Sequence, residues 1–374
     1  MAVLPLSHKW RVLLLASKWD RCYVPLYEAS ARGCRVRLLK TLMTNSCRNE
    51  CLYCPLRCLS AQEKRAWRPD KLAGIAVKLW REGIIEGVFL SSSIPRDPDS
   101  SVELELETAR ALRSMGFTGY MHLRLMPGVS RHLVAEAAEL ADRMGVNLEA
   151  PSADVFEEIC PDKGSFREDI LKRMEWAKEE AERAAREAGS RPYGACRAGL
   201  DTQMVVGAVE DSDLDFLSTT EWLFKRLGLR RVYFSPFEPV RGTPLEGREP
   251  CPRSRVLRLY QASFLLRDYG ISSAELGELV GPDGRLPDRD PKVALAELQA
   301  DRFPLDPNSA GFWELVRVPG IGPVAAKRIL ALRARGQEIR DVWDLARIIG
   351  LKRAVVAARY LDLKGRGLGA YTSA

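Results

Sequence analysis

Short apolar runs alternate with longer amphipathic stretches through the first two thirds of the chain. The runs are rich in β-branched and other apolar residues, as buried strands are, and the stretches between them have helical spacing. Six strands are predicted, at residues 35–44, 85–93, 119–128, 146–152, 201–209 and 230–240. Because parallel strands need crossover connections of helical length, this pattern predicts a parallel sheet and an α/β fold. The simplest such fold is a partial (β/α)6 TIM-like barrel over residues 35–250, with its chemistry in the loops after the strands.

Positive charge is concentrated toward the two ends of the chain. Residues 1–68 carry a net charge of +9 and residues 302–374 carry +7, whereas the residues between them carry −9. Two basic segments around an acidic middle are typical of proteins that bind a polyanion. An Arg-rich surface of the kind found in thermophilic proteins is the alternative explanation.

The composition favours a protein of the cell interior. No apolar run approaches the roughly 20 residues that cross a bilayer. The run "VLLLA" near the first residue lacks a cleavage site of small residues and is soon followed by charge, so we expect no signal peptide. Nine cysteines, an odd number in a long chain, argue against a disulfide framework and for metal or redox chemistry. We therefore expect a cytoplasmic protein without membrane association.

Four of the nine cysteines lie within "SCRNECLYCPLRC", residues 46–58, on the loop after the first predicted strand. The first three have the spacing C-x3-C-x2-C. A structural zinc site usually takes two separated pairs of Cys or His ligands, and the sequence has no later pair. Three thiolates on one short loop can instead bind three irons of a [4Fe–4S] cube and leave the fourth iron for another ligand. A zinc site or a purely structural role is the alternative.

This spacing, with Tyr53 directly before the third cysteine and a sixfold β/α pattern around it, resembles the radical S-adenosylmethionine (SAM) superfamily over about residues 35–246. In that superfamily the open iron binds SAM, an electron from the cluster cleaves it, and the 5′-deoxyadenosyl radical abstracts hydrogen from a substrate. The resemblance implies a [4Fe–4S] cluster and SAM as cofactors, with an electron donor such as ferredoxin or flavodoxin. The implied cluster ligands are Cys47, Cys51 and Cys54. Cys58 is expected to stand aside, because a fourth thiolate would occupy the iron that SAM needs.

The resemblance also implies a cradle for SAM at the ends of the later strands. Where many members have Gly-Gly-Glu after the second strand, this sequence has three serines and no Glu. Asn147 and Glu149 have the same parity on the fourth predicted strand, so both are expected to face the barrel interior. There the SAM ammonium or Arg124 would pair with the buried Glu. The expected cofactor-binding residues are Tyr53, Ser91, Ser92, Arg124, Asn147, Glu149 and Gln203, with ordinary barrel core as the alternative for the strand residues.

Two further cysteines lie near predicted strand ends or the approaches to them. Cys160 and Cys196 are candidate catalytic residues, as thiols that give a hydrogen atom to a product radical. A buried thiol with no chemical role is the alternative, because free cysteines are among the most buried residues.

A second motif lies near the end of the printed sequence. The segment "LVRVPGIGPVAAKRILALR", residues 315–333, resembles the helix-hairpin-helix motif. Its glycines let the hairpin backbone approach a phosphate, and the second helix offers free N–H groups and a favourable dipole. A degenerate second hairpin follows at residues 350–353. The expected nucleic-acid-binding residues are Gly320, Gly322, Lys327, Arg328, Lys352 and Arg353. Backbone contacts of this kind do not read sequence, and protein docking or a structural role is the alternative.

Over nearly its whole length the chain resembles a family of radical SAM proteins with a helix-hairpin-helix after the barrel, described as DNA modification or repair enzymes. The expected segments are a basic extension at 1–34, the barrel at 35–250, a helical extension at 251–300 and a nucleic-acid-binding domain at 301–374. The expected activity is reductive cleavage of SAM to modify or repair a nucleic acid, with DNA favoured. RNA, in particular tRNA, is one alternative substrate. A protein or small molecule is another, with the hairpin domain as a docking module.

Overall fold

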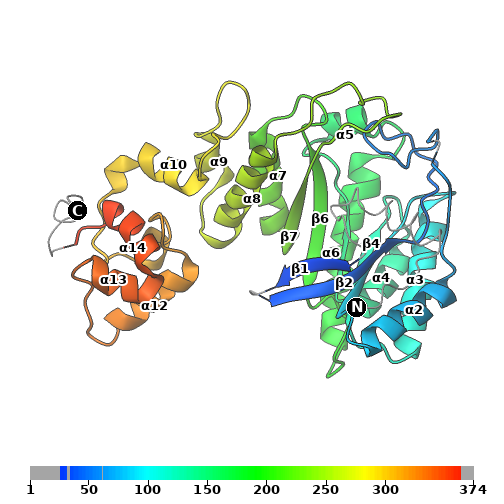
Figure 1. The fold of residues 1–374 in the computed structure, drawn as a ribbon, viewed down its shortest axis with the longest axis horizontal. Helices are drawn as coiled ribbons and strands as arrows, with labels where there is room; N and C mark the ends of the chain where they lie inside the picture. Colours follow the sequence, from blue (N-terminus) through cyan, green and yellow to red (C-terminus); the bar gives the residue numbers. More distant parts are fainter. Residues whose placement is uncertain (1–25, 32–33, 61, 364–374) are drawn as a thin grey trace. The chain divides into compact units, whose positions relative to one another are not determined.

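The computed structural model describes residues 26–31, 34–60 and 62–363 (Figure 1). Most of the predicted basic extension therefore lies outside the described residues. The chain divides into two compact units, which we treat separately. The first runs to Asp211 and includes Trp222–Pro252, and the second comprises Ser212–Glu221 and the residues from Arg253 onward.

The first unit is built on one seven-stranded sheet whose strand order follows the chain. Its strands are β1 Leu26–Ala31, β2 Cys34–Leu42, β3 Gly87–Ser91, β4 Tyr120–Leu125, β5 Arg143–Val146, β6 Gly199–Val206 and β7 Arg231–Pro236. β1 pairs antiparallel with β2, and each later strand pairs parallel with the strand before it. The six parallel strands form a curled half-barrel, which confirms the predicted α/β fold.

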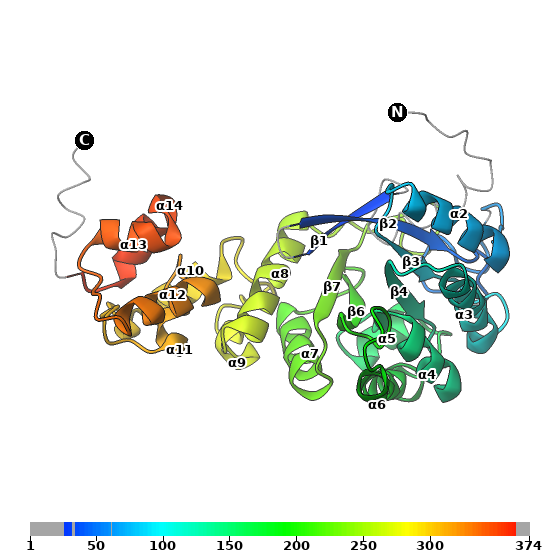
Figure 2. The same cartoon turned by 90° about the horizontal axis from the view of Figure 1, so that it is seen from below.

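Helices cover the outer, convex side of the curled sheet (Figure 2). They are α2 Pro69–Arg81, α3 Pro98–Ser114, α4 Arg131–Leu140, α5 Ala153–Ile159, and the π-helix η2 Phe166–Leu171 with α6 Lys172–Glu187. The helix α7 Asp213–Arg226 is divided between the two units. Local signals fix several starts; α3, for example, begins with Pro98 directly after Asp97, whose side chain accepts the Ser100 N–H. The helices α3, α4 and α6 pack directly on strands of the sheet.

The concave side of the sheet is polar. Met43 directly follows β2 and contacts Thr108 of α3. Odd-numbered residues of β2 therefore face the helices, because side chains alternate along a strand. Lys40 has the opposite parity, is buried, and lies 4.9 Å from the centre of the Phe89 ring on β3. His122 of β4 stacks on the same ring. Charged and aromatic side chains therefore fill the interior of the half-barrel.

The fourth parallel strand lies earlier than its predicted range of 146–152. The helical spacing before it predicts a helix up to residue 145, but α4 ends at Leu140. The carboxylate of Asp142 accepts the Met121 and Gly194 N–H groups at 2.8 and 2.9 Å. These contacts hold the chain extended from this point, so tertiary hydrogen bonds override the local helical pattern. The short helix α5 and the π-helical start of the next helix are likewise unpredicted features.

The second unit is helical. After α8 Arg253–Asp268 come α9 Ser273–Gly277, α10 Pro291–Leu298, η3 Ala300–Arg302, α11 Phe312–Leu315, α12 Pro323–Arg333, α13 Val342–Ile349, α14 Leu351–Ala357 and η4 Ala358–Tyr360. Apolar side chains from α11 to α14 share one buried core, which includes Leu315, Ile321, Ile329, Leu345 and Ala354. None of the helices in the described ranges combines the length and apolarity that a bilayer crossing requires.

Candidate functional site

The cysteine loop follows β2 at the carboxyl edge of the parallel sheet, as predicted. Cys51 is buried, Cys47 and Cys54 are partly buried, and Cys58 is exposed. Burial raises the pKa of Cys54 to about 12, and the nearby thiols of Cys51 and Cys47 add to this effect. The first three thiols therefore share one electrostatic environment, from which the exposed Cys58 side chain stands apart.

Backbone hydrogen bonds dock this loop on the segment after β5. The Leu52 N–H donates to the Ile159 carbonyl at 2.9 Å. The Glu50 N–H lies 2.9 Å from both carboxylate oxygens of Asp162. Because backbone groups on the loop are paired with groups more than a hundred residues later, its conformation depends on the assembled barrel.

A buried carboxylate connects the cysteine loop to the end of β5. The Tyr53 hydroxyl donates to one oxygen of Glu149 at 2.9 Å, and the Lys163 ammonium lies 2.5 Å from the other. Burial alone would lower the pKa of Lys163, but the Glu149 carboxylate and nearby thiols raise it well above its usual value. Lys163 is therefore a cation. It and Tyr53, rather than the expected Arg124, are the partners of Glu149.

The approach of Glu149 to this site differs from the expected strand geometry. β5 ends at Val146, and Glu149 has a positive φ of 67°. The alternation that would place Asn147 and Glu149 on one face therefore does not extend to them. The backbone of Glu149 is held by β6 instead, because its N–H donates to the Gln203 carbonyl at 2.9 Å and its carbonyl accepts the Val205 N–H at 2.8 Å.

Arg124 belongs to a second polar cluster inside the half-barrel. Its guanidinium lies 2.7 Å from one oxygen of Asp201 on β6, and Nε2 of His122 lies 3.1 Å from the other. Burial opposes the charge of Asp201, but Arg124 and His122 hold its pKa well below the usual range. Burial lowers the pKa of His122 to about 4. Gly145 makes the pairing across β5 sterically feasible, since a Cβ there would lie 2.7 Å from the Arg124 guanidinium.

The other predicted cradle residues lie at the same edge of the sheet. Ser91 ends β3, and both it and Ser92 are buried. The Met43 N–H donates to the Ser91 carbonyl at 2.7 Å, which holds this segment beside the start of the cysteine loop. Oδ1 of Asn147 is buried and has no hydrogen-bond partner among the residues that the structure describes. This free acceptor is suited to a ligand that donates a hydrogen bond.

The two candidate hydrogen donors lie at opposite edges of the sheet. Cys160 is buried next to the cysteine loop, with Sγ 4.0 Å from the Tyr53 hydroxyl. A hydrogen bond with Cys160 lowers the pKa of Cys51. Cys196 precedes β6, and its N–H donates to the Ala141 carbonyl just before β5. It therefore lies at the amino edge of the strands, and the structure does not bring Cys196 together with the cysteine loop.

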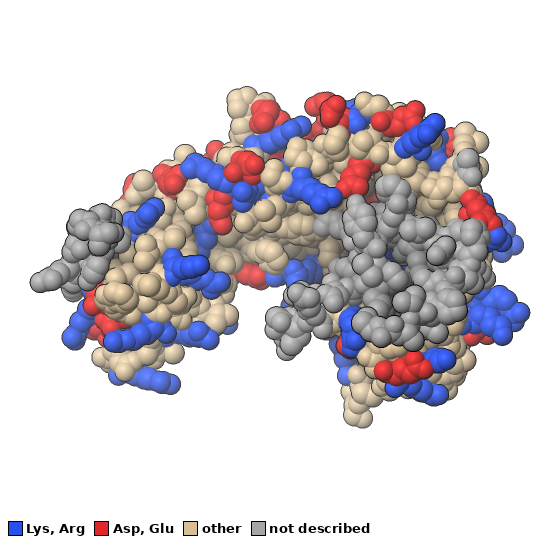
Figure 3. Space-filling view, in the orientation of Figure 1, with Lys and Arg blue, Asp and Glu red and all other residues tan. Residues whose placement is uncertain are grey.

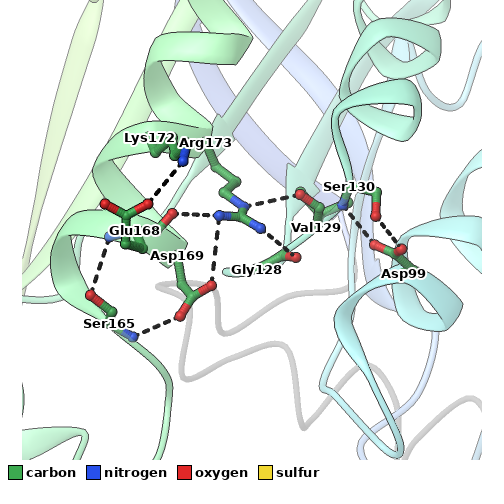
Figure 4. Close-up of polar contacts among 9 residues, drawn as sticks. All are labelled: Asp99, Gly128, Val129, Ser130, Ser165, Glu168, Asp169, Lys172 and Arg173. Atoms are coloured by element: carbon green, nitrogen blue, oxygen red, sulfur yellow. Dashed lines mark hydrogen bonds and ion pairs between the residues drawn. The ribbon is translucent and has the colours of Figure 1, made fainter.

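Figure 4 shows how the segment from Ser165 to Arg173 is braced against the loop after β4. The Arg173 guanidinium donates to the carbonyls of Val129 and Gly128 at 3.0 Å. The Asp169 carboxylate accepts the Ser165 N–H at 2.8 Å, and the Asp169 carbonyl accepts the Gly128 N–H at 2.9 Å. Through these hydrogen bonds the π-helix and the start of α6 join the loops after β4 and β5.

In the second unit, two helix pairs carry the predicted hairpins. Gly320 has a φ of 88°, and a Cβ there would lie 2.6 Å from the Arg353 carbonyl, so this turn needs glycine. Gly322 precedes α12 and Gly350 precedes α14. The remaining expected side chains, Lys327, Arg328, Lys352 and Arg353, are all exposed. In the view of Figure 3, lysine and arginine gather over α12 and α13.

Comparison with known protein families agrees with both parts of this architecture. Residues 41–183 match the radical SAM superfamily. These residues form a radical SAM domain. Residues 304–358 match the helix-hairpin-helix motif, so the chain carries both of the motifs that the sequence indicates. Radical SAM enzymes use a [4Fe–4S] cluster and SAM.

Solved structures with some likeness include two maturases of the [FeFe]-hydrogenase. HydG from Carboxydothermus hydrogenoformans is 16% identical over 61% of this chain and 50% of its own, with a TM-score of 0.46. A second HydG structure is 13% identical over 86% of this chain and 76% of its own, with a TM-score of 0.45. The chain thus spans half the length of the first maturase. No curated protein matches the chain.

The donor set present in this domain fits an iron–sulfur cluster. Three soft thiols lie on one loop, with the cationic Lys163 close to Cys51 and Cys54. Within the described residues, no group of three or more His, Cys, Asp or Glu side chains is arranged to hold a single metal ion. The ligands of a cube bind separate irons, so they are spread around a larger body.

Sequence reasoning missed three charged residues of this region. Asp162 and Lys163 lie in "CPDKG", directly after Cys160, and a charged pair in a loop gives no signal of its own. Asp201 is the first residue of a predicted strand, where a lone carboxylate among apolar residues is the only signal available. Its burial requires a cationic partner, which a search of neighbouring strands for inward-facing Arg or His would have found.

Proposed function

We propose that this protein is a radical SAM enzyme that binds a nucleic acid through its helix-hairpin-helix unit and modifies or repairs it, with DNA as the first substrate to test. The observation that carries the proposal is the joint presence of the three-thiol loop and the exposed, basic hairpins in one chain. Neither feature alone distinguishes a nucleic-acid substrate from a protein or a small molecule.

In this proposal Cys47, Cys51 and Cys54 hold the cluster, and Cys58 does not. When bound, the cluster and SAM supply a 5′-deoxyadenosyl radical that takes a hydrogen atom from the substrate. The protein's own groups hold SAM in place. Asn147 offers its unpaired Oδ1 as an acceptor.

The Glu149–Lys163 pair gives the site one carboxylate and one ammonium side by side. SAM carries both an ammonium and a carboxylate on its methionine portion, so each charge of the pair has a complementary group on the ligand. Tyr53 keeps the carboxylate oriented through its hydroxyl. These residues bind and orient, and the geometry gives them no part in moving a proton.

The second unit supplies binding that does not depend on sequence. Exposed Lys327 and Arg328 on α12 attract phosphates, while the hairpin turns offer backbone N–H groups. A base inside a duplex is not accessible to a radical, so the substrate position is unpaired or flipped out. A mismatch, a gap or a damaged base lowers the cost of that exposure.

The decisive experiment uses the full chain reconstituted anaerobically with iron and sulfide. Reduced protein is incubated with SAM, with or without duplex DNA, single-stranded DNA or tRNA, and 5′-deoxyadenosine is quantified. We expect formation by the wild type, stimulation by DNA, and none by Cys54→Ala. Absence of 5′-deoxyadenosine from four-iron protein contradicts the radical chemistry.

Mass spectrometry of the same nucleic acids, digested to nucleosides, tests the substrate. We expect a new or a lost modified nucleoside in the DNA reaction with wild-type protein and none with Cys54→Ala. A change in tRNA alone moves the substrate to RNA. SAM cleavage without binding to or change of either nucleic acid leaves a protein or small-molecule substrate.

A further inference from the structure

A partly buried lysine outside the helix-hairpin-helix motif supports its first turn. Lys292 lies on α10, before the matched residues 304–358. Its ammonium donates to the Ile321 carbonyl at 2.5 Å, within the turn that precedes α12. The same ammonium lies 4.7 Å from the centre of the Tyr269 ring. Lys292 is therefore directed at the turn and not at solvent.

The contact acts on one particular peptide group. The Ile321 carbonyl and the Gly322 N–H belong to the same planar, trans unit, so they point in opposite directions. A cation on the carbonyl polarises that unit and makes the N–H a stronger donor. The Gly322 N–H has no hydrogen-bond partner in the described part of the chain, and the next helix begins directly after it.

We propose that Lys292 is a positioning residue for the phosphate site of the first hairpin. It fixes the Ile321–Gly322 peptide with the Gly322 N–H turned away from α10, toward a phosphodiester oxygen of the bound nucleic acid. It does not touch the phosphate itself. This inference rests on the proposed binding of nucleic acid and assigns to α10, which the motif does not include, a role in that binding.

The groups around Lys292 make the contact sensitive to pH. Burial lowers the pKa of Lys292 to about 7, and the nearby Asp290 opposes this only in part. Tyr269, which packs on the ammonium, has a raised pKa and stays neutral. Arg353 of α14 and Asp268 of α8 are the other charges that act on Tyr269. Below pH 7 the ammonium is charged, so affinity is expected to fall as the pH rises from 6 to 8.5.

The test measures binding of a fluorescent DNA duplex to the full-length protein by anisotropy, as a function of salt and pH. At pH 6.5, Lys292→Met is expected to weaken binding about tenfold, the scale of one lost hydrogen bond to a charged group. The slope of log K against log salt is expected to stay unchanged, because no phosphate contact is removed. Lys292→Arg should restore affinity and remove the pH dependence.

Two further variants serve as the positive and the negative control for this measurement. Lys327→Met, at an exposed position on α12, should lower the salt slope by about 1, as loss of a direct phosphate contact does. Lys78→Met removes an exposed lysine from the first unit and should change neither quantity. Thermal unfolding of each variant shows whether the fold is intact.

Each outcome bears on one claim. Wild-type affinity that does not change from pH 6 to 8.5, or equal affinity of wild type and Lys292→Met, overturns the role of Lys292 while nucleic-acid binding stands. A reduced salt slope in Lys292→Met shows direct phosphate contact and also overturns it. No binding of duplex, single-stranded DNA or RNA by the wild type removes the proposed function and the role of Lys292 with it.

Discussion

The ammonium of Lys163 lies 2.5 Å from a carboxylate oxygen of Glu149, and the two side chains are only 15% and 4% exposed. The pair stands directly beside the cysteine loop, since the second oxygen of Glu149 accepts the Tyr53 hydroxyl. A buried ion pair is costly to form and more costly to break on one side. Its position at the expected SAM site makes it the first target for mutation.

Removal of the cation alone is expected to destabilise the first unit. Lys163→Met leaves the Glu149 carboxylate buried without its ion partner, which costs about 3–5 kcal/mol. The double variant Lys163→Met/Glu149→Gln should recover a large part of that loss, because no uncompensated charge remains. Urea unfolding of the wild type, Lys163→Met, Glu149→Gln and the double variant completes this double-mutant cycle. Additive losses would show that the two side chains do not act as a pair.

Substitutions of the cysteines separate three ligands from the fourth thiol. Cys47→Ala, Cys51→Ala and Cys54→Ala should each abolish a stable four-iron cluster, whereas Cys58→Ala should retain it, because Cys58 is exposed and apart from the others. Iron and sulfide content after anaerobic reconstitution and gel filtration measures this. Loss of the cluster in Cys58→Ala would make that thiol a ligand and contradict the open iron.

Asp162 should control how firmly the cysteine loop is held. Asp162→Asn weakens the charge-assisted acceptor of the Glu50 N–H, a loss of about 1–2 kcal/mol locally. We expect faster loss of iron under chelator than in wild type, with similar initial loading. The exposed Glu157 on α5 offers the matched control, and Glu157→Gln should release iron at the wild-type rate. Equal release from Asp162→Asn would show that the loop needs no such anchor.

Stability should depend on pH through His122. Its pKa in the folded protein is lowered to about 4 by burial, whereas the unfolded value is near 6.5. The stability that it contributes is therefore fully present above pH 6.5 and is lost as pH falls toward 4, by up to about 3 kcal/mol. Between pH 7 and pH 4.5, the unfolding free energy of His122→Asn should therefore fall by less than that of the wild type. An unchanged difference would place the pH dependence elsewhere.

Two glycines test the geometry of the first hairpin. Gly320 and Gly336 both have positive φ, so alanine is strained at each by about 1 kcal/mol. Only at Gly320 does a Cβ meet backbone, 2.6 Å from the Arg353 carbonyl, while Gly336 faces open space. Gly320→Ala should thus lower the unfolding temperature more than Gly336→Ala and also weaken DNA binding. Similar effects of the two variants would mean that the hairpins do not pack at this point.

The sequence predicted the parallel strands, the loop that carries the cysteines and the hairpin turns, because each has a local signature. Periodicity, cysteine spacing and paired glycines are visible within about ten residues. It could not predict that Asp142 ends α4, since the N–H groups that this carboxylate accepts come from Met121 and Gly194. It also could not pair Arg124 with Asp201, because that contact spans β5 and depends on Gly145.

The partners of the cysteine loop have a consequence for the order of assembly. Tyr53 and Glu149 are separated by 96 positions, and Glu50 and Asp162 by 112. Contacts across such separations form only after the intervening strands have paired, because closing so long a loop in an unfolded chain costs too much conformational entropy. During synthesis the thiols leave the ribosome long before the residues that hold their loop. Iron delivery to a properly formed loop is thus expected only after the first four of the six parallel strands have been made and folded.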